Sequence, residues 1–353
     1  MPRILPPVLF GLLFVCGCQS TLHLTELHSP SWEIQYEDST SLFIGLSVVD
    51  ENTVWVSGAP GKVGRTTNGG ETWMMLDGPW PDSLQFRDVH AFSDQEAFLL
   101  SIGPGEDSRI YHTADGGANW VLSFQNEDAN AFFDCFSFWD TQRGFAFSDS
   151  YDGEFTLIRS MNGGETWTRV NPEHIPDARD GEGSFAASGT CVETQTGGLG
   201  WFGTGASSVD TRVIRTTDYG ETWSEAITPI ESLAGDEGIT SVLFWDAQNG
   251  VALGSPSTRP TANVAITSDG GATWISSGGI ALGGQVYGAG IVPGTPTPTI
   301  VAVSPSGSAF STDNGATWTT FDNYEYWTTA FQSPTFGWAA GRGRISRLVN
   351  SGE

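Results

Sequence analysis

The chain has 353 residues, and its 41 acidic side chains against 15 Lys and Arg give a formal net charge of −26. Nucleic acids and anionic lipid surfaces are bound by clustered basic residues, so this charge argues against both as partners. The 45 Gly, 21 Phe and 14 Trp, in a chain that is 39% apolar, exclude a disordered polyanion and favour many short strands joined by tight turns.

Residues 1–18 are predicted to be a targeting segment. Arg3 precedes an apolar run at residues 8–15 that is too short to span a bilayer. The run leads into Val15-Cys16-Gly17-Cys18, which resembles a bacterial lipobox with Cys18 as the lipidated residue, although Cys16 is unusual there. We therefore expect an exported protein with a polar tether at 19–30, lipid-anchored to the bacterial cell envelope, in the outer membrane. An ordinary signal peptide and a periplasmic or secreted protein are the alternative.

One eight-residue turn recurs six times between residues 66 and 318. It begins with Thr or Ser, carries Asp or Asn at the third position and Gly at the fifth, and ends in Trp. The copies are TTNGGETW at 66–73, TADGGANW at 113–120, SMNGGETW at 160–167, TTDYGETW at 216–223, TSDGGATW at 267–274 and STDNGATW at 311–318. Repeats of about 45 residues with short alternating strands before each turn predict a β-propeller.

The number of blades follows from the tryptophans. Trp32 lies 41 residues before Trp73 and has the place of a further blade-ending Trp. Residues 326–331, 337–341 and 344–349 supply three strands of a last blade, and residues 31–36 are expected to complete it by pairing with 344–349. We therefore expect a single all-β domain over residues 31–350, a seven-bladed propeller with four-stranded antiparallel blades, and six blades as the alternative.

The turn matches the Asp-box, or BNR, motif S/T-x-D-x-G-x-T/S-W. Over the mature chain the sequence resembles the bacterial relatives of the photosystem II assembly/stability factor, and more distantly the sortilin-type and sialidase propellers. The segment at 181–191 (GEGSFAASGTC), Trp201 to Gly205 and Arg212 to Thr216 carry this resemblance. It implies a non-enzymatic, exported scaffold for other proteins. It also implies that the boxes lie on outer hairpins, away from the ligand face.

The box side chains are therefore interpreted as structural. Their carboxylate or amide oxygens accept hydrogen bonds from N–H groups of their own turn, and the Trp packs between sheets. The six positions are Asn68, Asp115, Asn162, Asp218, Asp269 and Asp313. No catalytic residue and no cofactor is assigned. A sialidase-like glycoside hydrolase is the enzymatic alternative, but Arg65, Arg159 and Arg215 repeat one position before the boxes, which favours a structural role.

Irregular loops from the third to fifth blades are the expected partner surface. The connection at 171–189 is the longest, and the loops at 149–154 and 255–261 lie on the same face. The candidate binding residues are Arg179, Asp180, Glu182, Ser184, Asp236, Glu237 and Arg259. Asp149, Asp152 and Glu154 are a weak Ca²⁺ candidate, because oxygen ligands suit that cation. Solvated acidic loops are the alternative interpretation.

Two cysteines remain in the mature body if Cys18 is lipidated. Cys135 and Cys191 each precede a Gly-aromatic pair by nine residues, so they occupy equivalent positions in adjacent blades. Export permits a disulfide between them, and two buried free thiols are the alternative. The expected function is a monomeric scaffold with protein partners, touching membranes only through its lipid. A carbohydrate-binding adhesin that exposes Trp327, Tyr287 or Tyr151 is a further alternative.

Overall fold

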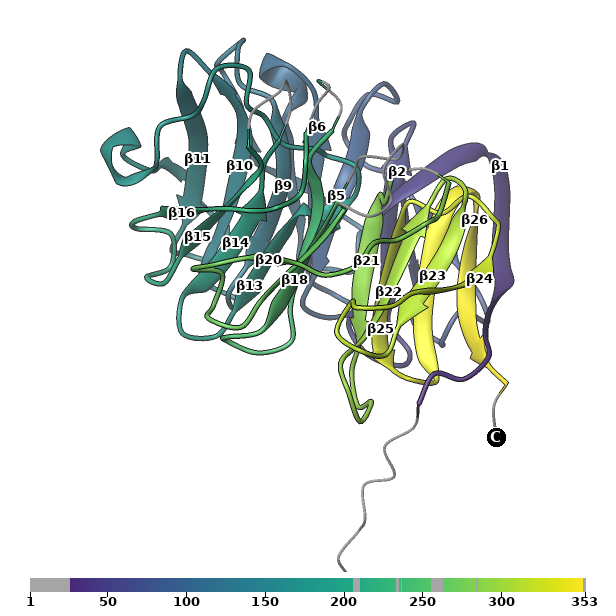
Figure 1. Ribbon diagram of the computed structural model, residues 1–353. Coiled ribbons are helices and arrows are strands. Elements are labelled where there is room, and N and C mark those ends of the chain that lie inside the picture. The colour runs from purple at the N-terminus through teal and green to yellow at the C-terminus, as the bar shows by residue number, and fades with distance from the viewer. Residues whose placement is uncertain are drawn as a thin grey trace, which may run out of the picture.

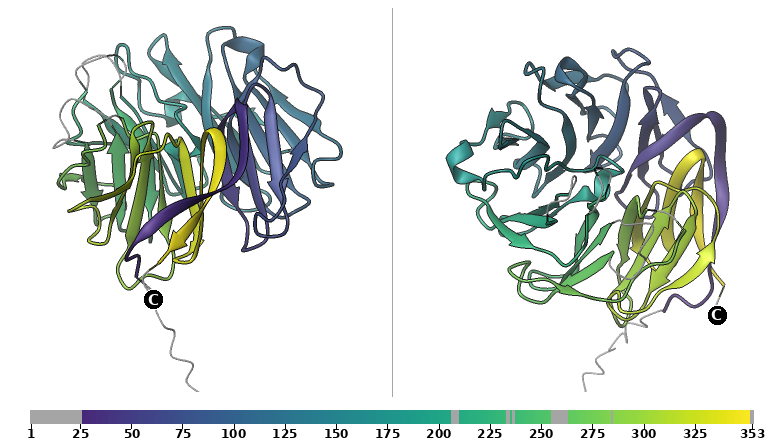
Figure 2. Two further views of the ribbon diagram at one scale, coloured as in Figure 1. Left: turned by 90° about the vertical axis from the view of Figure 1, so that its right-hand side faces the viewer. Right: turned by 45° about the horizontal axis from the view of Figure 1, so that its top comes forward.

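The computed structural model describes residues 26–205, 210–232, 235, 237–254, 263–283 and 285–351, and Cys18 lies outside these ranges. This part of the chain is all β and forms a ring of antiparallel sheets (Figures 1 and 2). Three single 3-10 turns interrupt it, namely η1 (Gly105–Asp107), η2 (Pro172–His174) and η3 (Gly189–Cys191). No helix within the described ranges has the length and apolar character needed to cross a membrane.

Five sheets have four strands, each paired with the next along the chain. The first contains β5 (Gln85–Ala91), β6 (Ala97–Ile102), β7 (Arg109–Thr113) and β8 (Val121–Gln125). The second contains β9 (Phe133–Phe138), β10 (Gly144–Tyr151), β11 (Glu154–Ser160) and β12 (Thr168–Arg169). The third contains β13 (Val192–Gln195), β14 (Leu199–Gly203), β15 (Arg212–Thr216) and β16 (Ser224–Ile227). The fourth contains β17 (Ile239–Phe244), β18 (Gly250–Gly254), β19 (Val264–Thr267) and β20 (Ile275–Ser276). The fifth contains β21 (Gly288–Val292), β22 (Thr299–Ser304), β23 (Gly307–Ser311) and β24 (Thr319–Asp322).

The sixth sheet joins the two ends of the chain. It has six strands in the order β25-β26-β1-β2-β3-β4. Their bounds are β25 (Thr328–Ser333), β26 (Phe336–Asn350), β1 (Pro30–Val48), β2 (Val54–Ala59), β3 (Lys62–Thr66) and β4 (Met74–Leu76). Figures 1 and 2 show β1, in purple, beside β26, in yellow. The predicted pairing of residues 31–36 with 344–349 is confirmed, since Ser31 faces Val349 and Trp32 faces Leu348.

The prediction of seven four-stranded blades is wrong, because the described residues form six sheets. The long strand β1 pairs with β26 through its first part, from Pro30 to Leu42, and with β2 through its second part, from Leu42 to Val48. The segments counted as a first and a last blade therefore belong to one hydrogen-bonded sheet. Tryptophan spacing reports where strands end, but it carries no information on whether two strand segments remain continuous.

The six recurring turns connect the third and fourth strands of their meanders, as expected. In every copy the third-position oxygen accepts the N–H of the residue four positions later, at 2.8–3.1 Å. The first-position hydroxyl accepts the N–H of the fifth-position Gly over the same range. Gly70 has a φ of +89°, and a Cβ there would lie 2.1 Å from the Trp338 ring. Glycine at this position thus serves both the left-handed backbone and the packing of a neighbouring ring.

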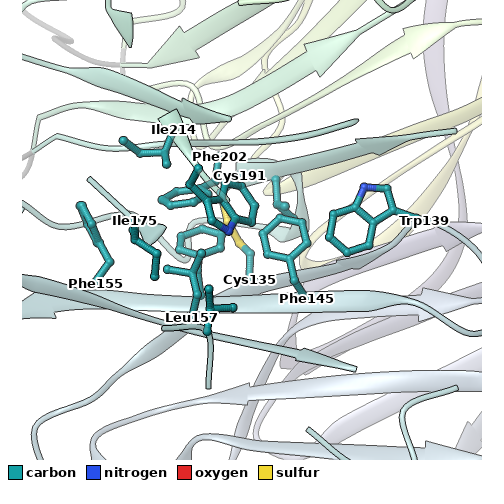
Figure 3. Close-up of a cluster of buried hydrophobic side chains, with 13 residues drawn as sticks. Cys135, Trp139, Phe145, Phe155, Leu157, Ile175, Cys191, Phe202 and Ile214 are labelled. Atoms are coloured by element: carbon teal, nitrogen blue, oxygen red, sulfur yellow. A yellow bond between two sulfur atoms is a disulfide. The ribbon is translucent and has the colours of Figure 1, made fainter. Parts of the chain in front are cut away.

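The core lies between adjacent sheets. The Trp120 ring of one turn lies 6.2 Å from the ring of Trp55 on β2, so this box Trp packs across a sheet boundary as predicted. The cluster in Figure 3 joins the second and third sheets, with Phe147 stacked on Phe202 at 4.3 Å. Cys135 and Cys191 lie inside this cluster and form a disulfide, with their Cα atoms 6.4 Å apart.

Candidate functional site

The predicted loop surface contains a pocket of about 670 Å³. We name it the loop pocket. Its walls are residues 149–153, in the β10–β11 hairpin, and residues 179–185, in the long connection from β12 to β13. The two walls are joined directly, because the Ser184 N–H donates to Asp149 Oδ1 at 2.7 Å and the Ser150 hydroxyl donates to the Glu182 carbonyl. The connection is thus a defined wall of the pocket.

The side chain of Glu182 is not exposed in the loop pocket. Its carboxylate is fully buried and forms a bidentate ion pair with Arg212, whose side chain is 2% exposed. Thr204 Oγ1 and the Arg179 N–H donate to the same carboxylate at 2.6 and 2.9 Å. Glu182 was predicted to be a binding residue, but a partner cannot reach its carboxylate, because the fold encloses it.

The other candidate residues differ in their exposure and in their hydrogen-bond partners. Asp180 is exposed, and Arg179 is half-buried with Nη1 3.2 Å from Asp210 Oδ2. Ser184 is buried and its hydroxyl donates to the Gly203 carbonyl at 2.8 Å. Glu237 is half-buried and its carbonyl accepts the Ser232 hydroxyl. Asp236 and Arg259 lie outside the described residues.

The Ca²⁺ candidate is not assembled. Asp149 points at the Ser184 N–H, and Glu154 lies 3.1 Å from Arg169 in an exposed ion pair. Across the described ranges, no three His, Cys, Asp or Glu side chains come together as a metal site. Burial raises the pKa of Asp149, and the hydrogen bond from the Ser184 N–H acts against this rise.

The chain runs from the loop pocket straight into the middle of the ring. Arg87 Nη1 donates to the Ala186 carbonyl at 2.7 Å, and the Ser188 hydroxyl donates to the Tyr287 carbonyl at 2.8 Å. Thr190 Oγ1 lies 2.7 Å from Ser241 Oγ. These contacts reach the β5, β17 and β21 sides of the ring. We name residues 186–191 the plug, because they cross the ring axis and are tied at their end by the Cys135–Cys191 disulfide.

Beyond the plug lies a cavity of about 720 Å³, which we name the channel chamber. Gly189 and Thr190 are part of its lining. Most of the rest comes from the first strands of the meanders and from β1 and β25, and the turn after β21 contributes residues 293–295. Asp88, His90 and Glu193 are the titratable side chains among its described lining residues. Sequence analysis missed them. The available signal was weak: Asp88 is a carboxylate between the apolar residues Phe86 and Val89, in a strand that also carries Arg87.

The chamber lacks the pattern that a sialidase needs. Its described lining contains neither arginine nor tyrosine. Arg65 and Arg215 instead donate to the carbonyls of Asp94 and Gly270, and Arg159 pairs with Glu221. Each of these arginines therefore bridges its own hairpin to the neighbouring sheet. The aromatic candidates Tyr287 and Trp327 lie against each other, with ring centroids 4.5 Å apart.

No family model matches the chain, and no curated protein matches it. Among solved structures, the chain is similar to YCF48 bound to D1 peptide, with a TM-score of 0.63 and 17% identity over 90% of this chain and 96% of that one. It is also similar to YCF48 from Cyanidioschyzon merolae, with a TM-score of 0.63 and 15% identity over 90% and 98% of the two chains. Streptogramin B lyase has a TM-score of 0.62 and 11% identity over 91% and 97%. At these identities the likeness establishes the fold alone, a β-propeller.

Proposed function

We propose that this protein is an exported, non-enzymatic propeller that binds a polypeptide partner in the loop pocket and holds it for assembly. The observation that carries the proposal is the loop pocket itself. It is about 670 Å³ in volume and is built from the β10–β11 hairpin and the long connection from β12 to β13. One propeller of similar fold was solved with a bound peptide, which supports this class of ligand.

The pocket wall is rigid enough to be a preformed site. The buried Arg212–Glu182 pair anchors the connection from below, and Arg212 Nη2 also donates to the Asp177 carbonyl at 3.0 Å. A wall held in place by a buried pair loses little conformational entropy when a ligand binds. Charged groups at the rim then select the partner.

The charge of the pocket favours a basic partner segment. Asp152 and Asp180 are exposed in its lining, while Arg179, the one arginine among the described lining residues, is already paired with Asp210. The chain as a whole carries a formal charge of −26, which steers cationic partners toward it. We therefore propose a segment that carries Lys or Arg.

Photo-crosslinking tests this proposal. A crosslinkable residue placed at Asp180 should capture one defined partner from native cell-envelope extract, whereas the same residue at Val121, which is 66% exposed on β8, should not. Charge reversal by Asp152→Arg should lower the yield from position 180, and Glu51→Arg, at an exposed turn, should leave it unchanged. Equal capture from positions 180 and 121 would overturn the proposed site.

We further propose that the six turns are Asp-box repeats and that Cys18 carries the lipid anchor. The regular hydrogen bonding of the turns supports the first assignment, and the Val15-x-Gly17-Cys18 spacing supports the second. Replacing Cys18 by Ser should move the protein from the membrane fraction to the soluble fraction, because a multiply acylated cysteine anchors far more firmly than one chain. A soluble wild-type protein would instead favour a periplasmic or secreted location.

A further inference from the structure

The channel chamber combines apolar walls with a few inward polar groups. Phe136, Phe244, Trp245 and Phe331 are among its lining residues. Its volume, about 720 Å³, lies within the range of small-molecule sites in proteins. The plug closes it on one side. Successive turns of each meander lie at alternate ends of the ring. The loop pocket lies at the end with the turns between second and third strands, and the chamber is lined at the end with the turns between first and second strands. The chamber therefore opens at the end opposite to the loop pocket.

Two carboxyl groups line the chamber without a cationic partner. Asp88 is 5% exposed, and its carboxylate accepts the N–H groups of Phe136 and Val89. Among the described residues, the donor to the Glu193 carboxylate is the N–H of its neighbour Thr194. No arginine or lysine is among the described residues that line the chamber. The walls keep most water away from Asp88 and part of it away from the half-buried Glu193, so a negative charge on either carboxyl has no cationic partner in the lining.

The titration of these groups agrees with that geometry. Burial raises the pKa of Asp88 to about 7 and that of Glu193 to about 8, even though backbone N–H donors act against the shift. Burial lowers the pKa of His90 to about 4, so the imidazole is neutral at neutral pH and supplies no compensating charge. A cation placed among them would favour both ionised carboxylates.

We propose that the channel chamber binds a small organic cation with an apolar body, such as an aryl or alkyl ammonium compound. The charged head pairs with Glu193, and Asp88, whose carboxylate already accepts two backbone N–H groups, adds negative charge to the same chamber. The apolar body packs on the aromatic walls, where ring faces also attract cations. The carboxyls give charge complementarity, and the plug limits the ligand to a small molecule. This site is separate from the loop pocket and does not depend on a protein partner there.

Calorimetric titration with benzyltrimethylammonium tests the proposal, because that probe keeps its charge at every pH. We expect saturable binding of one molecule per chain, stronger than that of the uncharged probe benzyl alcohol. Glu193→Gln should weaken binding by about tenfold, as a lost charge contact in a partly screened site does. The matched control Glu33→Gln, at an exposed position of β1, should change nothing. Affinity should rise between about pH 6 and about pH 9 as the two carboxyls ionise.

A second variant tests the location without altering charge. Ala330→Phe adds a ring to the β25 wall of the chamber and should reduce binding of the charged probe while the loop-pocket crosslink persists. Thermal melting identifies any variant that fails to fold. Undetectable binding to the wild type, or equal affinity in the wild type, Glu193→Gln and Ala330→Phe proteins, would overturn the proposal.

Discussion

The buried Arg212–Glu182 pair allows the sharpest test of how the loop pocket is supported. Replacing Glu182 by Leu removes an acceptor of four hydrogen bonds, two from Arg212 and one each from Thr204 and the Arg179 N–H. It also leaves the guanidinium, 2% exposed, with Glu225 as its remaining carboxylate. Breaking a buried pair from one side costs roughly 3–5 kcal/mol, and the contact to Glu225 places this case near the lower end.

The measurement is urea unfolding followed by tryptophan fluorescence. Asp180→Ala, two residues away and exposed, is the matched control and should change the free energy of unfolding by less than about 0.5 kcal/mol. The double variant Glu182→Leu with Arg212→Met should recover most of the loss, because an apolar pair replaces the orphaned charge. If Glu182→Leu were as mild as Asp180→Ala, the pair would not anchor the connection.

Three further perturbations have defined outcomes. Deleting residues 19–37 removes the part of β1 that pairs with Arg344 to Asn350 and should lower the melting temperature markedly; an unchanged value would contradict a closing role. Asp269→Ala should cost roughly 0.5–2 kcal/mol; its folded pKa is lowered to about 2, chiefly by the Thr273 hydroxyl, so the wild-type contribution is present above about pH 4 and is lost as pH falls through 2. Glu193→Gln should flatten the loss of stability on raising pH through about 8, since a raised carboxyl pKa stabilises at low pH, and chemical denaturation at pH 5 and 9 measures this.

What could be predicted from the sequence was local. Each box turn forms within eight residues, so its Asp or Asn, its Gly and its Trp report the hairpin directly. Residues 31–36 could also be assigned to β26, because a strand without a neighbour requires one. The number of sheets could not be predicted from the same spacing, since β1 continues from one pairing into the next without a turn.

The misassigned site residues have a different cause. Glu182 lies in a polar loop beside Asp180, and the two carboxylates are indistinguishable by composition. Glu182 is buried and Asp180 is exposed, because Arg212, thirty residues after Glu182, forms its ion pair with Glu182 alone of these two. Asp88 and Glu193 were missed for the complementary reason. Their strands read as ordinary alternating segments, and only closure of the ring makes one face of those strands the wall of a chamber.

The connection between β12 and β13 shows why irregularity, more than repetition, locates the candidate sites. Six turns repeat the same hydrogen bonds because each does the same structural task at its own hairpin. The connection has no such equivalent, and its residues 179–185 form a wall of the loop pocket before residues 186–191 cross the ring as the plug. A ladder of backbone hydrogen bonds would hold this segment if it only joined two strands. Its backbone makes only an isolated bridge, between Gly183 and Gly205, and the rest of the support comes from Arg212, Arg87 and the disulfide to Cys135, which lie on other strands. Side chains that reach this far to hold one segment fix the shape of both cavities that the segment borders.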